Sequence, residues 1–485
     1  MLFNSIDYLI FFPLVVLIYY VVPRKCRYIW LLLASYYFYM CWSPKYAILI
    51  AISTVITYLS GLGIEKTRTL DGKHAITLSK VIVAISFISN ISILFFFKYF
   101  QWILDNINSI FHSSVSLPFT IILPVGISFY TFQALSYSMD VYRGEIKAER
   151  NILKYALFVS FFPQLVAGPI ERSKNLLIQV KDIQKQRFDC QNVRNGLCLI
   201  LYGMFLKLVI SDRIAIYVDT VFEQYEQCGF LELSLAAILF AFQILCDFNG
   251  YSTIAKGSAK VLNIDLMDNF KQPYFATSIK QFWKRWHISL TTWFTDYLYI
   301  PLGGNRKGLK RQMLNTMIVF GVSGLWHGAN WNYVVWGVLH GIYQNIETVF
   351  HRICGKKRIA KKSVGGNVVK IVTTFVVTDI AWIFFRADSC RIAVQYLRQM
   401  FTSFHTKSML DLDFKLYDWI VLGIAMVIMA GVDVMHEKNI HLREKIFALP
   451  IGIRWVIYMT AVWGVLLFGI YGVGYDTSQF IYFQF

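Results

Sequence analysis

Two histidines, His287 and His327, are the residues of this chain whose type and setting best suit them to chemistry. They lie forty residues apart, and each directly follows a tryptophan, Trp286 and Trp326 respectively. Near physiological pH, one neutral imidazole can accept a proton while the other donates a hydrogen bond or stabilises charge. Acyl transfer to a hydroxyl group needs little more, since it requires a base for the alcohol and a donor for the oxyanion.

The motifs that the sequence lacks, and the polar residues near the histidines, limit the mechanisms that are possible. The sequence contains neither a G-x-S-x-G nucleophile elbow nor an H-E-x-x-H zinc motif, so a serine-hydrolase or zincin mechanism is not supported. A base–alcohol mechanism without a nucleophilic serine fits better. Ser289, Ser323 and Asn330 are candidate hydrogen-bond donors or orienting groups, and Trp286 and Trp326 are candidate residues for lining the substrate tunnel. We expect His340, a third imidazole, to pack in the interior or to line a tunnel.

His327 lies inside a stretch, residues 312–346, that contains no Asp, Glu, Lys or Arg. A run of this length can cross a bilayer and could fold back, because one span needs about 20 apolar residues. An imidazole at that depth needs a hydrogen-bond partner or a cavity, and intramembrane ionisable groups are functional candidates by default. The alternative is a structural histidine that packs against Trp326 and bonds a backbone carbonyl.

The composition predicts an all-α polytopic membrane protein. Of the 485 residues 56% are hydrophobic and only 16% are charged, against roughly 25% in soluble domains. We expect about eleven crossings, the first a retained helix and not a signal peptide. The clearest apolar windows are residues 8–23, 28–44, 46–64, 81–97 and 455–475, and weaker ones lie near 152–169, 195–210, 231–246, 368–388 and 417–432.

The net charge of +18 indicates how the chain is oriented in the membrane and does not point to a particular binding partner. Basic residues cluster in the loops at 24–27, 66–80 and 351–362, which fall on one side if the spans alternate. An excess of Lys and Arg marks that side as cytoplasmic. No DNA-binding or RNA-binding pattern accompanies the charge, so we expect no nucleic-acid partner. The eight cysteines form no C-x-x-C motif and pair with no His at zinc spacing, which predicts no disulfide and no bound metal.

Three segments depart from simple spans. Residues 123–133 and 161–172 mix Pro and Gly into apolar sequence, and broken backbone at membrane depth is tolerated only inside protein or along a watery cavity. We therefore expect Gln133 and Pro169 to line an internal site, the alternative being Pro-kinked packing helices. Residues 280–290 predict one amphipathic helix at the membrane surface, which carries His287 and Lys284 on a shared face.

Two of these motifs resemble the membrane-bound O-acyltransferase (MBOAT) family. They are Phe282 to Leu290 with Trp293 to Gly304, and Ser323 to Ala329. The start of the chain, with residues 124–130, 168–172 and 247–250, resembles the bacterial alginate O-acetyltransferase branch. The resemblance implies a ring of helices with re-entrant segments around a central tunnel. It also implies that His327 is the catalytic residue and His287 the second active-site position.

The resemblance implies a function as well. This branch moves an acetyl group from a cytoplasmic donor, acetyl-CoA, across the bacterial inner membrane to an exported polysaccharide or to peptidoglycan, through a separate extracytoplasmic acetyltransferase. No tightly bound cofactor is implied. A neighbouring branch transfers D-alanine from a carrier protein to teichoic acid. Coenzyme A is polyanionic, so Lys284, Arg285 and Arg306 are candidate phosphate ligands, although the cytoplasmic bias of basic residues also explains them.

We expect a single membrane domain over residues 1–485. Its parts would be N-terminal helices over 1–110, a catalytic core over 120–350 and C-terminal helices over 351–485. Two other functions remain open from the sequence. A proton-coupled transporter could use the two histidines as a relay, but inverted repeats and a series of carboxylates within the spans are not evident. A non-catalytic scaffold would leave both Trp-His motifs unexplained.

Overall fold

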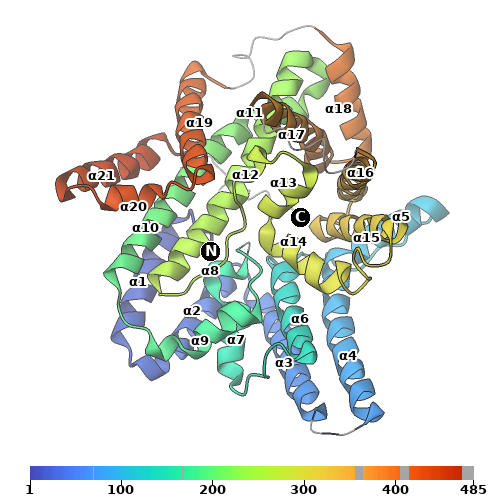
Figure 1. Cartoon of the computed structure of the whole chain (residues 1–485), viewed down its shortest axis with the longest axis vertical. Coiled ribbons are helices and arrows are strands. Elements are labelled where there is room, and N and C mark those ends of the chain that lie inside the picture. Colours follow the sequence, from blue (N-terminus) through green and yellow to red (C-terminus); the bar gives the residue numbers. More distant parts are fainter. Residues whose placement is uncertain (69, 71, 167, 355–363, 405–413, 472–485) are drawn as a thin grey trace. The chain divides into compact units, whose positions relative to one another are not determined.

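A computed structural model of the chain describes residues 1–485 except 69, 71, 167, 355–363, 405–413 and 472–485 (Figure 1). Within the described ranges every regular element is helical, which confirms the all-α prediction. Seven of the helices found there are long and apolar enough to cross a membrane. They lie at Pro44–Thr67, Lys73–Lys98, Cys190–Glu223, Phe230–Val261, Gly365–Arg386, Leu416–Glu437 and Ile451–Phe468. The figure of eleven crossings stays a prediction.

The chain divides into two compact units. Unit 1 comprises residues 1–200 and 252–267, and unit 2 comprises 201–251 and 268–485. Helices α10 (Cys190–Met204) and α12 (Phe230–Val261) pass from one unit to the other.

Unit 1 contains the N-terminal helices, whose positions agree with the first four apolar windows. Ser5 begins α1, because its side chain accepts a hydrogen bond from the backbone N–H of Tyr8. Pro44 begins α3 at a position where its missing N–H costs nothing. The helices of this unit are α1 (Ile6–Val21), α2 (Arg27–Met40), α3 (Pro44–Thr67), α4 (Lys73–Lys98), α5 (Phe100–Phe111), α6 (Ile127–Arg143), α7 (Ile152–Ser160), α8 (Phe162–Leu165) and α9 (Ile178–Lys181).

Small and hydroxyl-bearing residues hold α3, α4 and α6 side by side (Figure 1). Ser53 of α3 donates a 2.6 Å hydrogen bond to Asn90 of α4, and both side chains are buried. At Gly61 of α3, a Cβ would lie 2.6 Å from the ring of Tyr137 on α6, so only glycine admits the tyrosine. Close approach at small residues and interhelical hydrogen bonds are what hold helices together in lipid, where apolar burial drives little association.

The two Pro/Gly-rich segments are irregular, as their sequences predict. Residues 120–126 lie outside any helix, and α6 begins only after Gly126, whose φ of 73° is left-handed. After the four-residue α8, the chain from Gly168 to Glu171 is buried but not helical. Glu171 fixes this loop, since its carboxylate accepts 2.6 Å hydrogen bonds from the Met267 backbone N–H and the Asn175 amide. Burial raises the pKa of Glu171, which lies outside the seven spans, to about 7.

Unit 2 holds both histidines of interest. Its short helices α13 (Ile279–Arg285) and α14 (Ile288–Phe294) are followed by two long helices, α15 (Leu309–His327) and α16 (Trp331–Cys354). The remaining helices of the unit are α11 (Asp212–Glu223), α17 (Val364–Arg386), α18 (Cys390–Thr402), α19 (Leu416–Glu437), α20 (Leu442–Phe447) and α21 (Ile451–Phe468).

The uncharged stretch at 312–346 does fold back, and α15 and α16 form a hairpin. Glycines set how closely the two helices pack. A Cβ at Gly337 would overlap the carbonyl oxygen of Phe320, and one at Gly341 would lie 2.8 Å from the sulfur of Met317. Since real Cβ atoms do not approach backbone so closely, position 337 requires glycine, whereas at position 341 the methionine side chain would have to shift.

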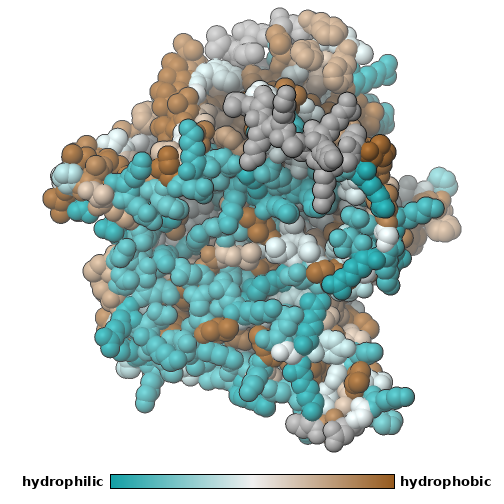
Figure 2. Space-filling view, viewed as in Figure 1, coloured by the Kyte–Doolittle hydropathy of each residue, from teal (hydrophilic) through white to brown (hydrophobic). Residues whose placement is uncertain are grey.

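Helix α21 shows the surface that such a protein presents to lipid. Trp455, Val456 and Leu467 are each more than half exposed, and Figure 2 shows hydrophobic residues along this projecting helix. Exposed apolar side chains at this density suit a hydrocarbon environment and not water.

Candidate active site

His287 lies at a break between α13 and α14. Its φ of 41° and ψ of 55° are left-handed, a conformation that costs free energy in a residue with a Cβ. The prediction of one amphipathic helix across residues 280–290 is therefore wrong. Helix α13 ends at Arg285, and His287 is buried while Lys284 on the supposed shared face is exposed.

The break has a physical cause, which is Asn269. The backbone carbonyl of Asn269 accepts a 2.9 Å hydrogen bond from the N–H of Ile288, and its side-chain Oδ1 accepts one of 3.3 Å from the N–H of Ser289. The N–H of Lys271 also donates to the carbonyl of Arg285 at 3.0 Å. Asn269 thus accepts hydrogen bonds from two N–H groups, and Lys271 donates to a carbonyl, that a continuous helix would bond internally, and these bonds hold the His287 turn.

The imidazole of His287 is 1% exposed and lies among aromatic rings. Its centroid is 4.7 Å from that of Phe248, nearly perpendicular to it, and 5.9 Å from that of Trp326. Burial lowers the pKa of His287, which lies outside the seven spans, to about 3. The ring is therefore neutral at physiological pH and is a weak base.

His327 is the last residue of α15 and is 3% exposed. Its ring lies 4.9 Å from Trp336 and 5.4 Å from Phe385, both in edge-on geometry. The hairpin explains this setting. Gly328 ends α15 where any Cβ would overlap the ring of Tyr333, and the returning α16 brings Trp336 against His327.

The two histidines meet at one indole. The ring centroid of Trp326 is 5.0 Å from that of His327 and 5.9 Å from that of His287. Unit 2 thus brings together two imidazoles that are distant in sequence, in a buried and mainly aromatic setting. Such a site can accept a proton at one ring and donate a hydrogen bond from the other, because neutral imidazole carries both an acceptor and a donor nitrogen.

Several predicted site residues lie beside the histidines. Trp286 is buried against Trp382 at 4.9 Å and is stacked on Phe282 at 5.5 Å. Ser289 on α14 and Ser323 on α15 are both buried.

Asn330 is held in place by a hydrogen bond to a loop. Its amide nitrogen donates a 3.0 Å hydrogen bond to the carbonyl of Asp388, in the connection between α17 and α18. That bond gives Asn330 a structural role in joining this connection to the α15–α16 turn. Its part as an oxyanion donor remains a prediction.

The three candidate phosphate ligands have different surroundings. Lys284 and Arg306 are exposed. Arg285 instead forms a two-pronged ion pair with Glu437 of α19, at 2.7 Å and 2.9 Å, and donates to the carbonyl of Gln272 at 3.2 Å. The planar fork of Arg285, which suits a phosphate, is thus already taken by a carboxylate.

Gln133 and Pro169 belong to unit 1, and their place along a tunnel stays a prediction. Gln133 is buried on α6, where it accepts a 2.9 Å hydrogen bond from Gln164 and donates to the carbonyl of Phe158. Pro169 is buried in the irregular segment that follows α8.

His340 is enclosed by aromatic side chains, as expected for a packing residue. It is fully buried, and its Nδ1 accepts a 3.3 Å hydrogen bond from the indole N–H of Trp283. Its ring lies parallel to that of Phe282, with a centroid distance of 6.2 Å.

Sequence reasoning missed Asn269, Phe248 and Trp336. Asn269 lies in the polar segment that begins at Asp268, but no local pattern shows that it bonds residues almost twenty positions later. Within the ranges that the structure describes, no three His, Cys, Asp or Glu side chains are grouped as metal ligands would be.

Comparison with known proteins identifies the family of this chain. Residues 107–387 match the model of the MBOAT, membrane-bound O-acyltransferase family. The chain is 36% identical over 409 residues to "Probable alginate O-acetylase AlgI" of Pseudomonas putida, covering 83% of this chain and 80% of that protein.

Two other relatives extend the comparison. The "Peptidoglycan O-acetyltransferase" of Helicobacter pylori is 35% identical over 396 residues, 77% of this chain and 73% of its own. The "Teichoic acid D-alanyltransferase" of Bacillus subtilis is more distant, at 27% over 268 residues, 53% of this chain and 67% of its own. The family match contains both histidines and the aromatic rings around them. The chain belongs to the membrane-bound O-acyltransferase family and is a multi-pass membrane O-acetyltransferase.

Proposed function

We propose that this protein takes an acetyl group from acetyl-CoA on the cytoplasmic side of a bacterial inner membrane and delivers it for O-acetylation of a cell-surface polysaccharide or of peptidoglycan. The observation that carries the proposal is the pair of buried imidazoles on the indole of Trp326, inside the region that matches the family. The names of the relatives at 35–36% identity support acetyl as the group transferred.

In the proposed reaction His327 is the general base. It takes the proton of the acceptor hydroxyl while the oxygen attacks the carbonyl carbon of the acetyl thioester. The C–S bond then breaks, and the proton passes from His327 to the departing sulfur of coenzyme A. His287, whose lowered pKa makes it a poor base, instead donates a hydrogen bond to the oxyanion of the tetrahedral intermediate.

The exposed basic residues provide a place for the donor's phosphates. Lys284 and Arg306 are free of the bidentate carboxylate pair that engages Arg285, so they carry this part of the proposal. The acceptor is reached through a separate extracytoplasmic acetyltransferase, which would supply the choice of glycan.

Transfer of radiolabelled acetyl from acetyl-CoA by proteoliposomes tests the proposal. Together with an extracytoplasmic acetyltransferase partner, the wild-type protein should label a glycan acceptor, and His327→Ala with the same partner should not, although the variant is inserted and folds. A variant with wild-type transfer would remove His327 from the mechanism. A D-alanyl-loaded carrier protein is the matched alternative donor, and transfer from it alone would assign the chain to the activity named for its Bacillus subtilis relative.

A further inference from the structure

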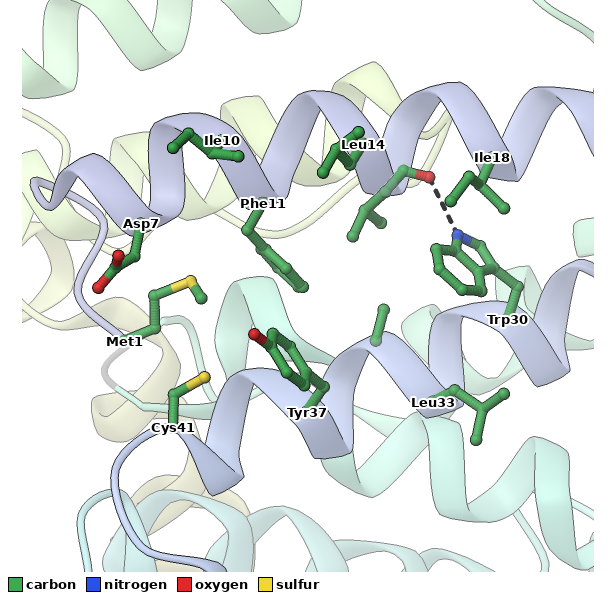
Figure 3. A pocket seen from close by; sticks show the side chains of 12 residues that line it. Met1, Asp7, Ile10, Phe11, Leu14, Ile18, Trp30, Leu33, Tyr37 and Cys41 are labelled. Carbon is green, nitrogen blue, oxygen red and sulfur yellow. Dashed lines mark hydrogen bonds between the residues drawn. The ribbon is translucent and has the colours of Figure 1, made fainter.

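A groove separates α1 from α2 along most of their length (Figure 3). It has a volume of about 770 Å³. Its floor is made by buried side chains, among them Phe11, Val15 and Ala34, while Leu14 and Leu33 on its rim are more than half exposed. A buried floor with an exposed rim means that the groove opens sideways from the helix pair.

Polar groups lie at one end of the groove only. That end contains Met1, whose amino group lies near the carboxylate of Asp7 at the start of α1, with Tyr37 in the last turn of α2 and Cys41 directly after this helix (Figure 3). At the other end, Trp30 of α2 joins the helices, because its indole N–H donates a 3.0 Å hydrogen bond to the carbonyl of Val15. The side chains between these two ends are apolar.

The dimensions fit hydrocarbon chains. From Asp7 to Ile18 the groove follows eleven residues of helix, roughly 16 Å, which is close to half of the roughly 30 Å thickness of the apolar bilayer core.

The distribution of charge gives the groove a direction. The basic loop at Arg24, Lys25 and Arg27 joins the far ends of α1 and α2 and is expected on the cytoplasmic side. The end that carries Asp7 then lies at the extracytoplasmic headgroup level. A carboxylate beside an amino group at that level suits a zwitterionic headgroup, whose ammonium group would face Asp7 and whose phosphate would face Met1.

We propose that this groove binds the acyl chains of an amine-bearing phospholipid, such as phosphatidylethanolamine, from the extracytoplasmic leaflet. The headgroup lies beside Asp7 and the chains run along α1 towards Trp30. This site lies in unit 1, and the inference does not depend on the acetyl-transfer proposal.

Photolabelling tests the site directly. The full-length protein is placed in vesicles that contain phosphatidylethanolamine with a diazirine on its acyl chain, and the cross-linked residues are mapped by mass spectrometry. Labels should concentrate on the groove residues of α1 and α2. Leu14→Trp at the exposed rim and Ala34→Trp on the floor should each lower this labelling at least fivefold.

Leu17→Trp is the matched control, because Leu17 is 62% exposed on the same helix but does not line the groove. It should leave labelling of the groove unchanged. Equal labelling of the groove and of the Leu17 face would mean fluid surrounding lipid only and would overturn the proposal. A benzophenone residue at Leu14 that captures protein instead of lipid would also overturn it.

The headgroup is tested by competition. Asp7→Asn should lower the recovery of bound phosphatidylethanolamine relative to phosphatidylglycerol about threefold, since the carboxylate that selects the ammonium group is lost. An unchanged ratio would contradict the assigned position of the headgroup.

Discussion

The two histidines are positioned by opposite means. His327 ends a regular helix whose neighbour packs against it at glycines, so its place follows from the α15–α16 hairpin. His287 lies between two short helices in left-handed backbone, and hydrogen bonds from residues 269–271 hold that turn. The first ring depends on close packing, and the second depends on a few named hydrogen bonds. Substitutions that displace His327 should therefore differ in their effects from substitutions that displace His287.

The largest expected effect is on the chemistry itself. His327→Ala should lower acetyl transfer by about 10²–10⁴-fold, the usual contribution of a general base. The variant should still fold, with a lower thermal unfolding temperature, because loss of the buried ring leaves a cavity beside Trp336 and Phe385. The measurement is the rate of acetyl transfer, together with unfolding in detergent. A variant that is inactive because it unfolds would show His327 to be a packing residue.

The α15–α16 hairpin should be destabilised by substitutions that disturb its close packing. Gly337→Leu should push α15 and α16 apart, because the new side chain overlaps the backbone of Phe320, and overpacking typically costs about 1–3 kcal/mol. Gly321→Ala, on the same pair of helices but with open space at the Cβ position, should be tolerated. Thermal unfolding distinguishes the two, and equal unfolding temperatures would contradict the close approach.

The turn at His287 should be disturbed by the loss of one hydrogen bond. Asn269→Leu removes the acceptor for the N–H of Ser289 and should lower the turnover rate about 10–100-fold, since a small displacement of His287 costs roughly this much. Asn269→Asp keeps an acceptor oxygen and should retain more activity than the leucine variant. The ratio of their turnover rates is the measurement. Equal loss in both would mean that Asn269 acts through something other than this bond.

The smallest effect is on stability at low pH. The folded protein holds the pKa of His287 below the unfolded value, so folding excludes a proton and stability falls as pH drops below about 6.5. Between pH 7 and 5 the loss from this one residue should approach about 2 kcal/mol. His287→Gln should remove that part of the pH dependence of unfolding. An unchanged dependence would mean that the His287 ring is hydrated.

Apolar windows predicted much of the fold, because membrane helices are long and locally encoded. The windows at 46–64, 81–97 and 417–432 correspond to α3, α4 and α19. The site was harder to predict, because contacts between residues distant in sequence determine it. Residues 280–290 do carry a helical pattern, but Asn269 breaks it from a distance. Likewise, no pattern around Arg285 could show that Glu437 pairs with its guanidinium.

That ion pair has a consequence for where the protein can be cut. The match to the family ends at residue 387, whereas the carboxylate that neutralises Arg285 comes from α19, well beyond that boundary. A shortened version that stops at the end of the matched region would keep both Trp-His motifs. It would, however, remove the carboxylate that pairs with Arg285, two positions before His287. The C-terminal helices thus supply a charged partner to the segment that carries the second histidine.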